Sequence, residues 1–553
     1  MDRREALWRI DATLKAKGFR ETGPGIADYE GTVPVHGKPV DIGISIPDVR
    51  FASKPVVTLK DRSQIPLDTL AHIETDSGIC YATGPGLPID LYQPGEAILR
   101  VLEEARRTLE LSFRGRAARE IIDEFQHYWH PELNVRCMVA KRGSASVIHA
   151  TLFVATIGKS PAFMCLAERA ALRGYDAAAP RPAQIWYVDN PVGPAAGIRA
   201  PKTLAQLQRW FAGQAGLTAK RWDTAFHALA EGQALFVAAP NAFVGLRLAF
   251  PKDLEVGLKR GSIRQQAIPR LLSARPDSIL LDRYSGAWCS IEDLTARNSL
   301  AQTSLQGKSI ALVGCGTVGS HLARMLVQSG AGIDAPFSVF DKEILSEGNI
   351  GRHLLGFGDI GKPKALALQA ELERFHPQAK IHPYAEDATE LWEQLAAHDL
   401  IVDTTGEWNV QSALNEQFLS DTAAKSTALL HAWVFMNGAG AQSFLNCRDE
   451  FACFRCLKPQ FDGPWRYPAG DEKDELNLQP AACGDGAFIP FTVDASCMAA
   501  SLANRAAVDW AGAKAGPRLR TVQVDPERGR YQKPVSPKPS PQCPACSARR
   551  SAE

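Results

Sequence analysis

Along the first 125 residues, short stretches of alternating hydrophobic and polar positions lie between two segments with helical spacing. Alternation with a period of two indicates half-buried strands, whereas apolar residues three and four positions apart indicate helices. The predicted elements are a helix over residues 4–17, strands over 33–39, 41–46 and 55–59 with Gly37 near the first turn, and a long helix over 95–111. Residues 1–125 are therefore expected to form an α+β domain.

The middle of the chain, residues 126–275, has a less regular pattern. Strands are predicted over 135–140, 146–157, 234–238 and 244–250, and helices over 204–215 and 222–231. Segments 178–183 and 190–201 are rich in Pro, Gly and Ala and are predicted to be linkers or surface loops. We expect an α/β connecting domain, whose role the sequence does not indicate.

From residue 276 to 553, short apolar strands alternate with amphipathic helices. The predicted strands cover 310–313, 337–340, 380–384 and 399–402, and the helices cover 320–329, 365–375 and 493–510. This alternation favours a mostly parallel, doubly wound sheet of the Rossmann type, whose ligand lies at the carboxyl ends of the strands. Residues 276–553 are therefore expected to form the third domain.

The composition narrows the class of protein further. The 553 residues include 62 Lys and Arg against 61 Asp and Glu, a net charge of +1, which gives no reason to expect nucleic acid or an anionic membrane as a partner. The charged N-terminus does not resemble a signal peptide, and the longest apolar run, residues 234–250, is interrupted by Pro240, Asn241 and Arg247. A soluble cytoplasmic protein is expected, in which the twelve cysteines serve as thiols, nucleophiles or metal ligands rather than as a disulfide framework.

A glycine-rich loop follows the first strand of the C-terminal region. Gly314, Gly316 and Gly319 form a GxGxxG motif between strand 310–313 and the next helix. Glycines let backbone amides approach a phosphate, and the helix directs its positive N-terminus at the charge. Asp341, after the following strand, is suited to a ribose hydroxyl pair. These residues predict a nucleotide site but leave NAD, FAD and ATP open.

The residues that follow Asp341 favour ATP. Asn349, Arg352 and Lys364 can neutralise charge on a triphosphate as pyrophosphate leaves, whereas a nicotinamide or flavin oxidoreductase needs no such cluster. Together with Asp341 they resemble the ATP site of the ThiF/MoeB/ubiquitin-activating superfamily, which adenylates the C-terminal glycine of a protein. The resemblance extends from Leu280 to the C-terminus, and it implies ATP and Mg²⁺ as ligands and a homodimer.

The same resemblance suggests roles for other residues of this region. The family usually has an Asp-x-Thr-Asp motif after a later strand. Asp403 keeps its first position and is expected near the nucleotide, while Gly406 replaces the second carboxylate, which helps to hold Mg²⁺. In this family an arginine from a leading segment reaches ATP, often in the partner subunit of a dimer. Arg283 and Arg297 are both candidates, and the alternative for each is a solvated surface arginine.

Two CxxC pairs, Cys453 with Cys456 and Cys543 with Cys546, lie far apart in the sequence. Each pair forms a tight knuckle, and two knuckles can present four thiolates to Zn²⁺ across a long intervening stretch. A redox dithiol is the alternative, but a single pair would suffice for it. We expect a zinc site that ties the C-terminal tail to the domain, and the ThiF/MoeB resemblance implies the same site.

Two further cysteines are candidate nucleophiles. Cys483 resembles the cysteine that the activating family places before a long helix, where a thiolate captures the acyl group of an acyl adenylate as a thioester. Cys80 resembles the thioester cysteine of the ubiquitin-conjugating fold, and the alternative is a small buried hydrophobe. His72 precedes Cys80 without the family's asparagine between them, so either His72 or a backbone amide steadies the oxyanion, or the domain no longer transfers.

Together these parts predict one sequential enzyme. ATP activates a C-terminal glycine, Cys483 takes the acyl group, Cys80 receives it, and an amine such as a lysine of a target protein accepts it. The order of domains resembles the bacterial activating–conjugating fusions of CBASS anti-phage operons, which implies a cGAS-like nucleotidyltransferase (CD-NTase) as donor and an antiviral role. The alternatives are a bacterial ubiquitin-like protein as donor, or a sulfur-carrier-activating adenylyltransferase in which Cys80 is dispensable.

Overall fold

The computed structural model of the chain describes residues 2–23, 27–61, 71–73, 77–82, 87, 89–113, 117–129, 133–139, 146–157, 160–167, 176–195, 198–298, 303–421, 427–480, 487–514 and 516–547. These residues fall into two compact units that divide between Ala287 and Trp288. Within the described part of the chain, every helix is too short or too polar to cross a membrane.

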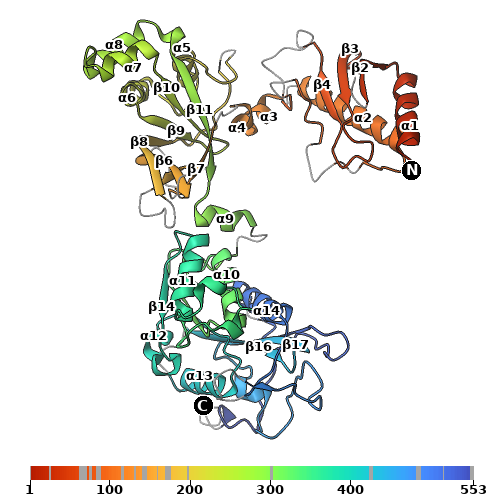
Figure 1. The fold of residues 1–553 in the computed structure, drawn as a ribbon, viewed down its shortest axis with the longest axis vertical. Helices are drawn as coiled ribbons and strands as arrows, with labels where there is room; N and C mark the ends of the chain where they lie inside the picture. Colours follow the sequence, from red (N-terminus) through yellow and green to blue (C-terminus); the bar gives the residue numbers. More distant parts are fainter. Residues whose placement is uncertain are drawn as a thin grey trace. The chain divides into compact units, whose positions relative to one another are not determined.

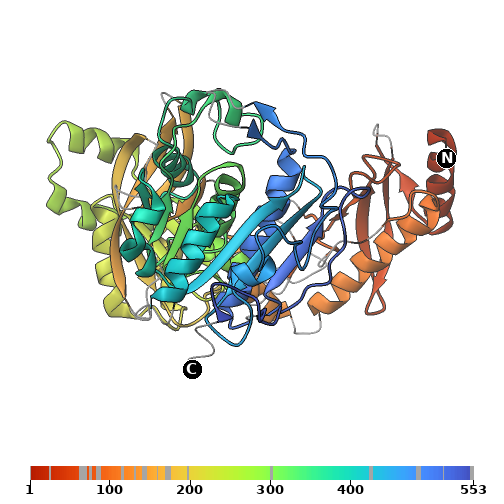
Figure 2. The same ribbon diagram turned by 90° about the horizontal axis from the view of Figure 1, so that it is seen from below.

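The first unit begins with an α+β domain, as predicted. Its helices are α1 (Arg3–Ala16) and α2 (Pro94–Phe113), and its antiparallel sheet consists, in order, of β1 (Arg20–Glu21), β2 (Asp28–Val35), β3 (Lys38–Ser45) and β4 (Val56–Leu59). His36 and Gly37 have φ values of 47° and 76°, so a tight two-residue turn joins β2 to β3 near the predicted position. Both helices share one apolar core with the sheet, along which α2 lies lengthwise (Figure 2).

The rest of the first unit is a closed barrel with helices packed against it. The chain enters the barrel through α3 (Ala117–Asp123) and α4 (Phe125–Tyr128) (Figure 1). The described strands, in order around the barrel, are β10 (Phe243–Ala249), β11 (Leu280–Trp288), β5 (Leu133–Cys137), β7 (Ser160–Ala167), β6 (Val147–Ile157), β8 (Asp176–Tyr187) and β9 (Ala234–Ala238). The described helices that share its core are α4, through Phe125, and α5 (Leu204–Ala212), α6 (Ala219–Ala230), α7 (Lys252–Lys259) and α8 (Ile268–Ser273).

Two stretches of the barrel differ from the sequence predictions. Residues 178–183, predicted as a loop, lie inside the long strand β8. Pro180 and Pro182 are tolerated there because β9 pairs with β8 only from Ala183 onward, so the preceding edge needs no N–H donors for β9. Strand β11 was grouped with the C-terminal region, but it pairs with β10 over residues 280–285 and belongs to the barrel.

The second unit is built on a doubly wound sheet, as predicted. Its strands, in spatial order, are β14 (Ile381–Tyr384), β13 (Phe337–Phe340), β12 (Ile310–Val313), β15 (Leu400–Asp403), β16 (Ala428–Phe435), β17 (Gly440–Asn446) and β20 (Leu519–Gln523). Pairing is parallel from β14 to β16 and antiparallel beyond. The chain runs outward from β12 in one direction and then returns to β15, so the carboxyl ends of these two strands form a switch point.

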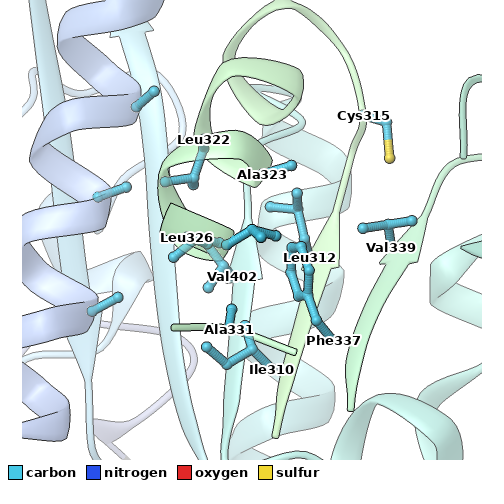
Figure 3. Packing of buried hydrophobic residues seen from close by; sticks show 14 of the residues in the cluster. Ile310, Leu312, Cys315, Leu322, Ala323, Leu326, Ala331, Phe337, Val339 and Val402 are labelled. Atoms are coloured by element: carbon cyan, nitrogen blue, oxygen red, sulfur yellow. The ribbon is translucent and has the colours of Figure 1, made fainter. Parts of the chain in front are cut away.

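Alternate residues of the central strands face two helical layers. One layer consists of α10 (Thr317–Gln328), α11 (Lys364–Phe375) and α14 (Val493–Ala511), and the other of α12 (Trp392–Ala396) and α13 (Trp408–Ser420). Figure 3 shows Leu322 and Leu326 of α10 beside Leu312 of β12 and Val402 of β15. This packing holds the start of α10 against the carboxyl edge of the sheet.

Candidate functional site

A cavity of about 690 Å³ opens at the carboxyl edge of the parallel strands in the second unit. The loops after β12, β13 and β15 form its walls, where the doubly wound topology predicts a ligand site. Five of the predicted nucleotide-binding residues line it, namely Gly314, Gly316, Asp341, Asn349 and Arg352. The volume is in the range of pockets that bind small molecules.

The glycine loop depends on glycine at two positions. Gly314 has a φ of +86°, which residues with a side chain rarely adopt. A Cβ on Gly319 would lie 1.8 Å from the carbonyl oxygen of Gly314, so Gly319 lets α10 begin directly against the loop. At Gly316, which caps α10, nothing lies within 4 Å of the Cβ position. The first turn of α10 therefore lines the cavity.

Asp341 holds the glycine loop in place. Its Oδ2 accepts a hydrogen bond from the backbone N–H of Cys315 (2.6 Å), and its Oδ1 accepts one from the N–H of Glu343 (2.8 Å). Burial raises the pKa of the Asp341 carboxyl, and these hydrogen bonds and the charge of Lys364 oppose that shift. Each carboxylate oxygen has a further lone pair, so Asp341 can also accept a hydroxyl of a ligand.

His353 supports the same loop from within the core. Its Nε2 lies 2.7 Å from the carbonyl oxygen of Cys315, and its Nδ1 accepts a hydrogen bond from the N–H of Leu355 (3.0 Å). The proton must therefore be on Nε2, which donates to the loop. Burial lowers the pKa of His353 to about 4, so the imidazole is neutral near pH 7.

Arg352 and Asn349 supply further polar groups to the cavity wall. The guanidinium of Arg352 lies 4.9 Å from the ring centroid of Phe491, and burial lowers the pKa of Arg352. The Oδ1 of Asn349 accepts hydrogen bonds from the N–H (3.0 Å) and the hydroxyl (3.1 Å) of Ser346. These contacts hold the side chains of Arg352 and Asn349 in the cavity wall, where a cation and an amide are available to a bound phosphate group.

Three of the predicted nucleotide-binding residues do not line the cavity, namely Gly319, which packs against the glycine loop, Lys364 and Asp403. Lys364 is only 4% exposed and pairs through its Nζ with Glu343. Asp403 is fully buried, its Oδ2 lies 2.7 Å from Nδ1 of His431, and its Oδ1 accepts hydrogen bonds from the backbone and hydroxyl of Thr405. Asp403 continues the alternation of Ile401, which faces the layer of α13, so it stabilises the turn after β15 instead of facing the cavity.

The two candidates for the leading-segment arginine lie on separate elements. Arg283 lies on β11, opposite Leu246 in the barrel. Arg297 is an exposed residue of α9 (Ile291–Asn298).

Sequence analysis missed several polar residues of the cavity wall. Thr405 and Glu407 follow β15, Lys342 follows β13, and Asp387 follows β14. Lys342 pairs with Asp387 (2.8 Å), and this contact lowers the pKa of Asp387 to about 2. Their common signal is a position just after the carboxyl end of a parallel strand, which the predicted topology could have revealed.

Four buried cysteine sulfurs form a second cluster in this unit. The ligand atoms of Cys453, Cys456, Cys543 and Cys546 all lie within 4.8 Å of one another. Three of the Sγ–Sγ distances are 3.8 Å (Cys453–Cys456), 3.6 Å (Cys453–Cys543) and 3.4 Å (Cys456–Cys546). A tetrahedral zinc ion with Zn–S bonds of about 2.3 Å separates its sulfurs by roughly 3.8 Å. The donor set and its spacing therefore fit Zn²⁺.

Cys483 lies outside the described residues. On either side of it, β18 (Gln479–Pro480) pairs antiparallel with β19 (Ala487–Phe488). Ile489 and Phe491, which follow β19, line the nucleotide-type cavity.

A separate cavity of about 740 Å³ in the first unit has Cys80 and His72 in its wall. Cys80 is exposed, so it is not a small buried hydrophobe. A bridge between Ile73 and Ile79 brings the two segments together, and the N–H of Cys80 donates to the carbonyl oxygen of His72 (2.8 Å). The imidazole of His72 lies near the carboxylates of α3 and α4, which no sequence motif indicated.

Two family models match the chain. The model described as Prokaryotic E2 family B matches residues 5–138, and the ThiF family model matches residues 292–545. The first match covers the α+β domain and extends to β5, and the second covers most of the second unit.

Similar proteins match the chain over very different lengths. The ATP-dependent ubiquitin transferase-like protein Cap2 of Pseudomonas aeruginosa is 27% identical over 576 residues, which cover 98% of this chain and 99% of that protein. The sulfur carrier protein adenylyltransferase of Thermus thermophilus is 25% identical over 190 residues, which cover 33% of this chain and 67% of that protein. The structure of the microcin C7 biosynthetic enzyme MccB in complex with N-formylated MccA has 17% sequence identity to this chain and a TM-score of 0.36, and the match covers 53% of this chain and 85% of that chain.

Proposed function

Because the chain belongs to the family of enzymes that fuse a prokaryotic E2-like domain to a ThiF domain, as the Cap2 proteins do, we propose that it works through a two-cysteine relay. ATP-dependent conjugation is the activity of this class of enzyme. In the relay, the C-terminal glycine of a donor protein is adenylated, captured by Cys483, passed to Cys80 and joined to an amine of a target. One observation carries the proposal: the chain has a nucleotide-type cavity and also an exposed cysteine in a cavity of its own.

Adenylation would use the cavity of the second unit. The amides of the glycine loop and the N-terminus of α10 would receive the phosphates of ATP, and Asp341 a ribose hydroxyl. Arg352 and Asn349 would stabilise the charge that develops as pyrophosphate leaves. Partial burial of Arg352 strengthens this effect, since charges interact more strongly away from water.

Two metal ions fit the donor groups of the second unit. Bound Mg²⁺ would neutralise charge on the phosphates, and it prefers oxygen ligands. Since Asp403 is engaged by His431 and Gly406 has no side chain, Glu407 is our candidate for the carboxylate, because it lines the cavity directly after Gly406. The four clustered cysteines would hold Zn²⁺ as a closed structural site.

Transfer between the two cysteines conserves the energy of the adenylate. When a thiolate attacks the acyl adenylate, a carbon–sulfur bond forms and AMP leaves. Exchange between Cys483 and Cys80 then replaces one carbon–sulfur bond by another. The last step forms an amide bond with the target and releases the thiol of Cys80.

We propose a cGAS-like nucleotidyltransferase with a C-terminal glycine as the donor. The support is the order of domains, which resembles the activating–conjugating fusions of CBASS anti-phage operons. A ubiquitin-like protein is the alternative donor, and mass spectrometry of the adduct on Cys483 distinguishes the two. We also propose a homodimer through the second unit, on the same family resemblance.

The relay is tested with protein expressed together with its genomic neighbours. Non-reducing electrophoresis compares the wild type with Cys483→Ala and Cys80→Ala, with Cys497→Ala on α14 as a matched control outside both cavities. A thiol-sensitive adduct that persists in Cys80→Ala and vanishes in Cys483→Ala, with final conjugates that need both cysteines, supports the relay. ATP–pyrophosphate exchange should continue in Cys483→Ala and in Cys80→Ala, because adenylation precedes capture of the acyl group by a cysteine.

A second candidate function is activation of a sulfur carrier. It is favoured by the match to the Thermus thermophilus adenylyltransferase and by a match to the molybdopterin-synthase adenylyltransferase of Escherichia coli, 28% identical over 163 residues that cover 29% of this chain and 62% of that protein. Under this function Cys80 has no role. Unchanged product formation in Cys80→Ala would therefore favour it over the relay.

A further inference from the structure

The cavity around Cys80 extends beyond the compact core formed by α1, α2 and the strands β1 to β4. His72, Ile73 and Cys80 form one part of its wall, and residues 123–128, from the end of α3 through α4, form another. Asn134 of β5 and Ser285 of β11 complete it, so the barrel contributes as well. A substrate bound at Cys80 would therefore touch groups that no conjugating-fold motif predicts.

Charges in this cavity favour a cationic ligand. Its described lining contains the carboxylates of Asp123 and Glu124 and the imidazoles of His72 and His127, but neither Lys nor Arg. A lysine side chain reaching for Cys80 arrives as an ammonium ion, which these carboxylates attract. The ammonium ion must then lose a proton before its nitrogen can attack a thioester.

The backbone of His72 is held by several contacts in a conformation that non-glycine residues rarely adopt, with a φ of 61°. Its N–H donates to the hydroxyl of Tyr128 (2.6 Å), and that hydroxyl donates to Oε2 of Glu124 (2.8 Å). Arg199 lies over the Tyr128 ring (4.2 Å to its centroid) and donates to the carbonyl oxygen of Ile73 (2.9 Å). The entry to the barrel thus fixes the turn that carries His72.

The imidazole of His72 lies between two carboxylates. Its Nδ1 is 3.1 Å from Oε1 of Glu124, and its Nε2 is 3.6 Å from Oε2 of Glu120. The ring is largely buried, yet neither contact is a hydrogen bond, and Nδ1 of His72 and Oε2 of Glu120 are buried polar atoms without a hydrogen-bond partner. Buried polar atoms of this kind call for an explanation, such as a catalytic role or a missing ligand.

We propose that Glu124 and Glu120 position His72 as the base that accepts the proton of the incoming amine, so that the helices leading into the barrel are part of the conjugating active site. This inference rests on the proposed function, in which Cys80 carries the acyl group. The amine nitrogen attacks the thioester carbon, the C–N bond forms, and the C–S bond breaks with its electrons going to sulfur. Before the attack, the ammonium ion gives one proton to His72, whose imidazolium the two carboxylates stabilise, and His72 later returns this proton to solvent. The nitrogen loses its second proton as the C–S bond breaks, and the departing thiolate takes that proton up.

The test separates loading of Cys80 from discharge. The full chain is charged with its donor and ATP, EDTA stops further activation, and free L-lysine is added as the amine probe. Discharge of the Cys80 thioester is followed from pH 6 to pH 10 in the wild type, His72→Gln, Glu124→Gln and Glu120→Gln. Glu103→Gln, an exposed carboxylate paired with Arg106 on α2, is the matched control.

We expect all variants to load Cys80. At pH 7, His72→Gln should discharge about 100-fold more slowly and Glu124→Gln about 10-fold more slowly, in line with the usual contribution of a general base. The difference should shrink toward pH 10, where lysine deprotonates without help. The charged and polar side chains around His72 are those of Glu120, Glu124, Asp123, His127, Tyr128 and Arg199. A merely structural role would instead slow discharge equally at every pH.

The outcomes distinguish the two proposals. If the wild type never forms a thioester on Cys80, the proposed function fails. If the wild type loads but Glu124→Gln and His72→Gln discharge like Glu103→Gln, or are slowed to the same extent from pH 6 to pH 10, the positioning role is refuted. Should His72→Gln fail to load, the isosteric Glu124→Gln decides by the same criterion.

Discussion

Substitution of Gly319 by alanine tests how the glycine loop supports the nucleotide-type cavity. The added Cβ would lie 1.8 Å from the carbonyl oxygen of Gly314 and 2.5 Å from Oγ1 of Thr404. Real Cβ atoms essentially never come closer than 3.0 Å to such neighbours, so α10 and the loop must separate by more than 1 Å. One of the obstructing atoms belongs to the backbone, which cannot rotate away as a flexible side chain can.

The expected cost follows from two opposing effects. Overpacking a well-packed site costs about 1–3 kcal/mol, whereas alanine in place of glycine gains about 0.5–1 kcal/mol within a helix. Gly319→Ala should therefore destabilise the second unit by roughly 1–2 kcal/mol, which for a unit of this size lowers its melting temperature by about 2–8 °C. It should also lose ATP–pyrophosphate exchange, because the loop amides move from their positions.

Gly316→Ala is the matched comparison within the same motif. Its Cβ would meet nothing within 4 Å, and its φ of −73° suits alanine, so the melting temperature should change by no more than about 1 °C. The methyl group would occupy space at the cavity wall, and ATP affinity should fall while the fold is retained. Thermal unfolding and pyrophosphate exchange are measured for both variants. Equal stability of Gly319→Ala and Gly316→Ala would refute the close-approach argument.

Three further predictions concern the second unit. Cys546→Ser should lose bound zinc in elemental analysis and lower the melting temperature, whereas Cys497→Ser, outside the cluster, should do neither; zinc retained by Cys546→Ser would contradict the four-cysteine site. Between pH 6.5 and 4, His353 binds fewer protons in the folded protein than in the unfolded protein. The free energy of unfolding of the wild type should therefore fall by up to about 3 kcal/mol as the pH falls through this range, and that of His353→Gln should fall less over the same titration. His431→Ala leaves Oδ2 of the buried Asp403 without a hydrogen-bond partner, while Oδ1 keeps its bonds from Thr405, and should cost about 1–3 kcal/mol in denaturant unfolding. Lys342→Ala breaks an exposed pair and should cost much less, and similar costs would argue against a stabilising contact between Asp403 and His431.

Elements with strong local signals could be predicted from the sequence. The predicted bounds of β12 and β13 agree with the structure residue for residue, because each is a short apolar run that ends at a glycine or an aspartate. The cysteine cluster followed from two CxxC pairs, since spacing within each pair is a local constraint and thiolates favour zinc. The glycine loop was also predictable from a local constraint, because its motif marks the place where one strand meets the helix that follows it in the sequence.

Features that depend on distant partners were decided only by the tertiary structure. Periodicity shows which face of a segment is apolar but not which sheet the segment belongs to. For this reason the sequence did not predict that residues 178–183 form part of β8 or that β11 belongs to the barrel. The side chain of Asp403 does not face the cavity, because it lies on the same face of β15 as Ile401 and contacts His431 on the neighbouring strand β16. The carboxylates beside His72 come from residues some 50 positions away, and only the packing of α3 and α4 against the Cys80 loop brings them there. The sequence alone thus determined the local chemistry of each site, and long-range packing determined which charges surround it.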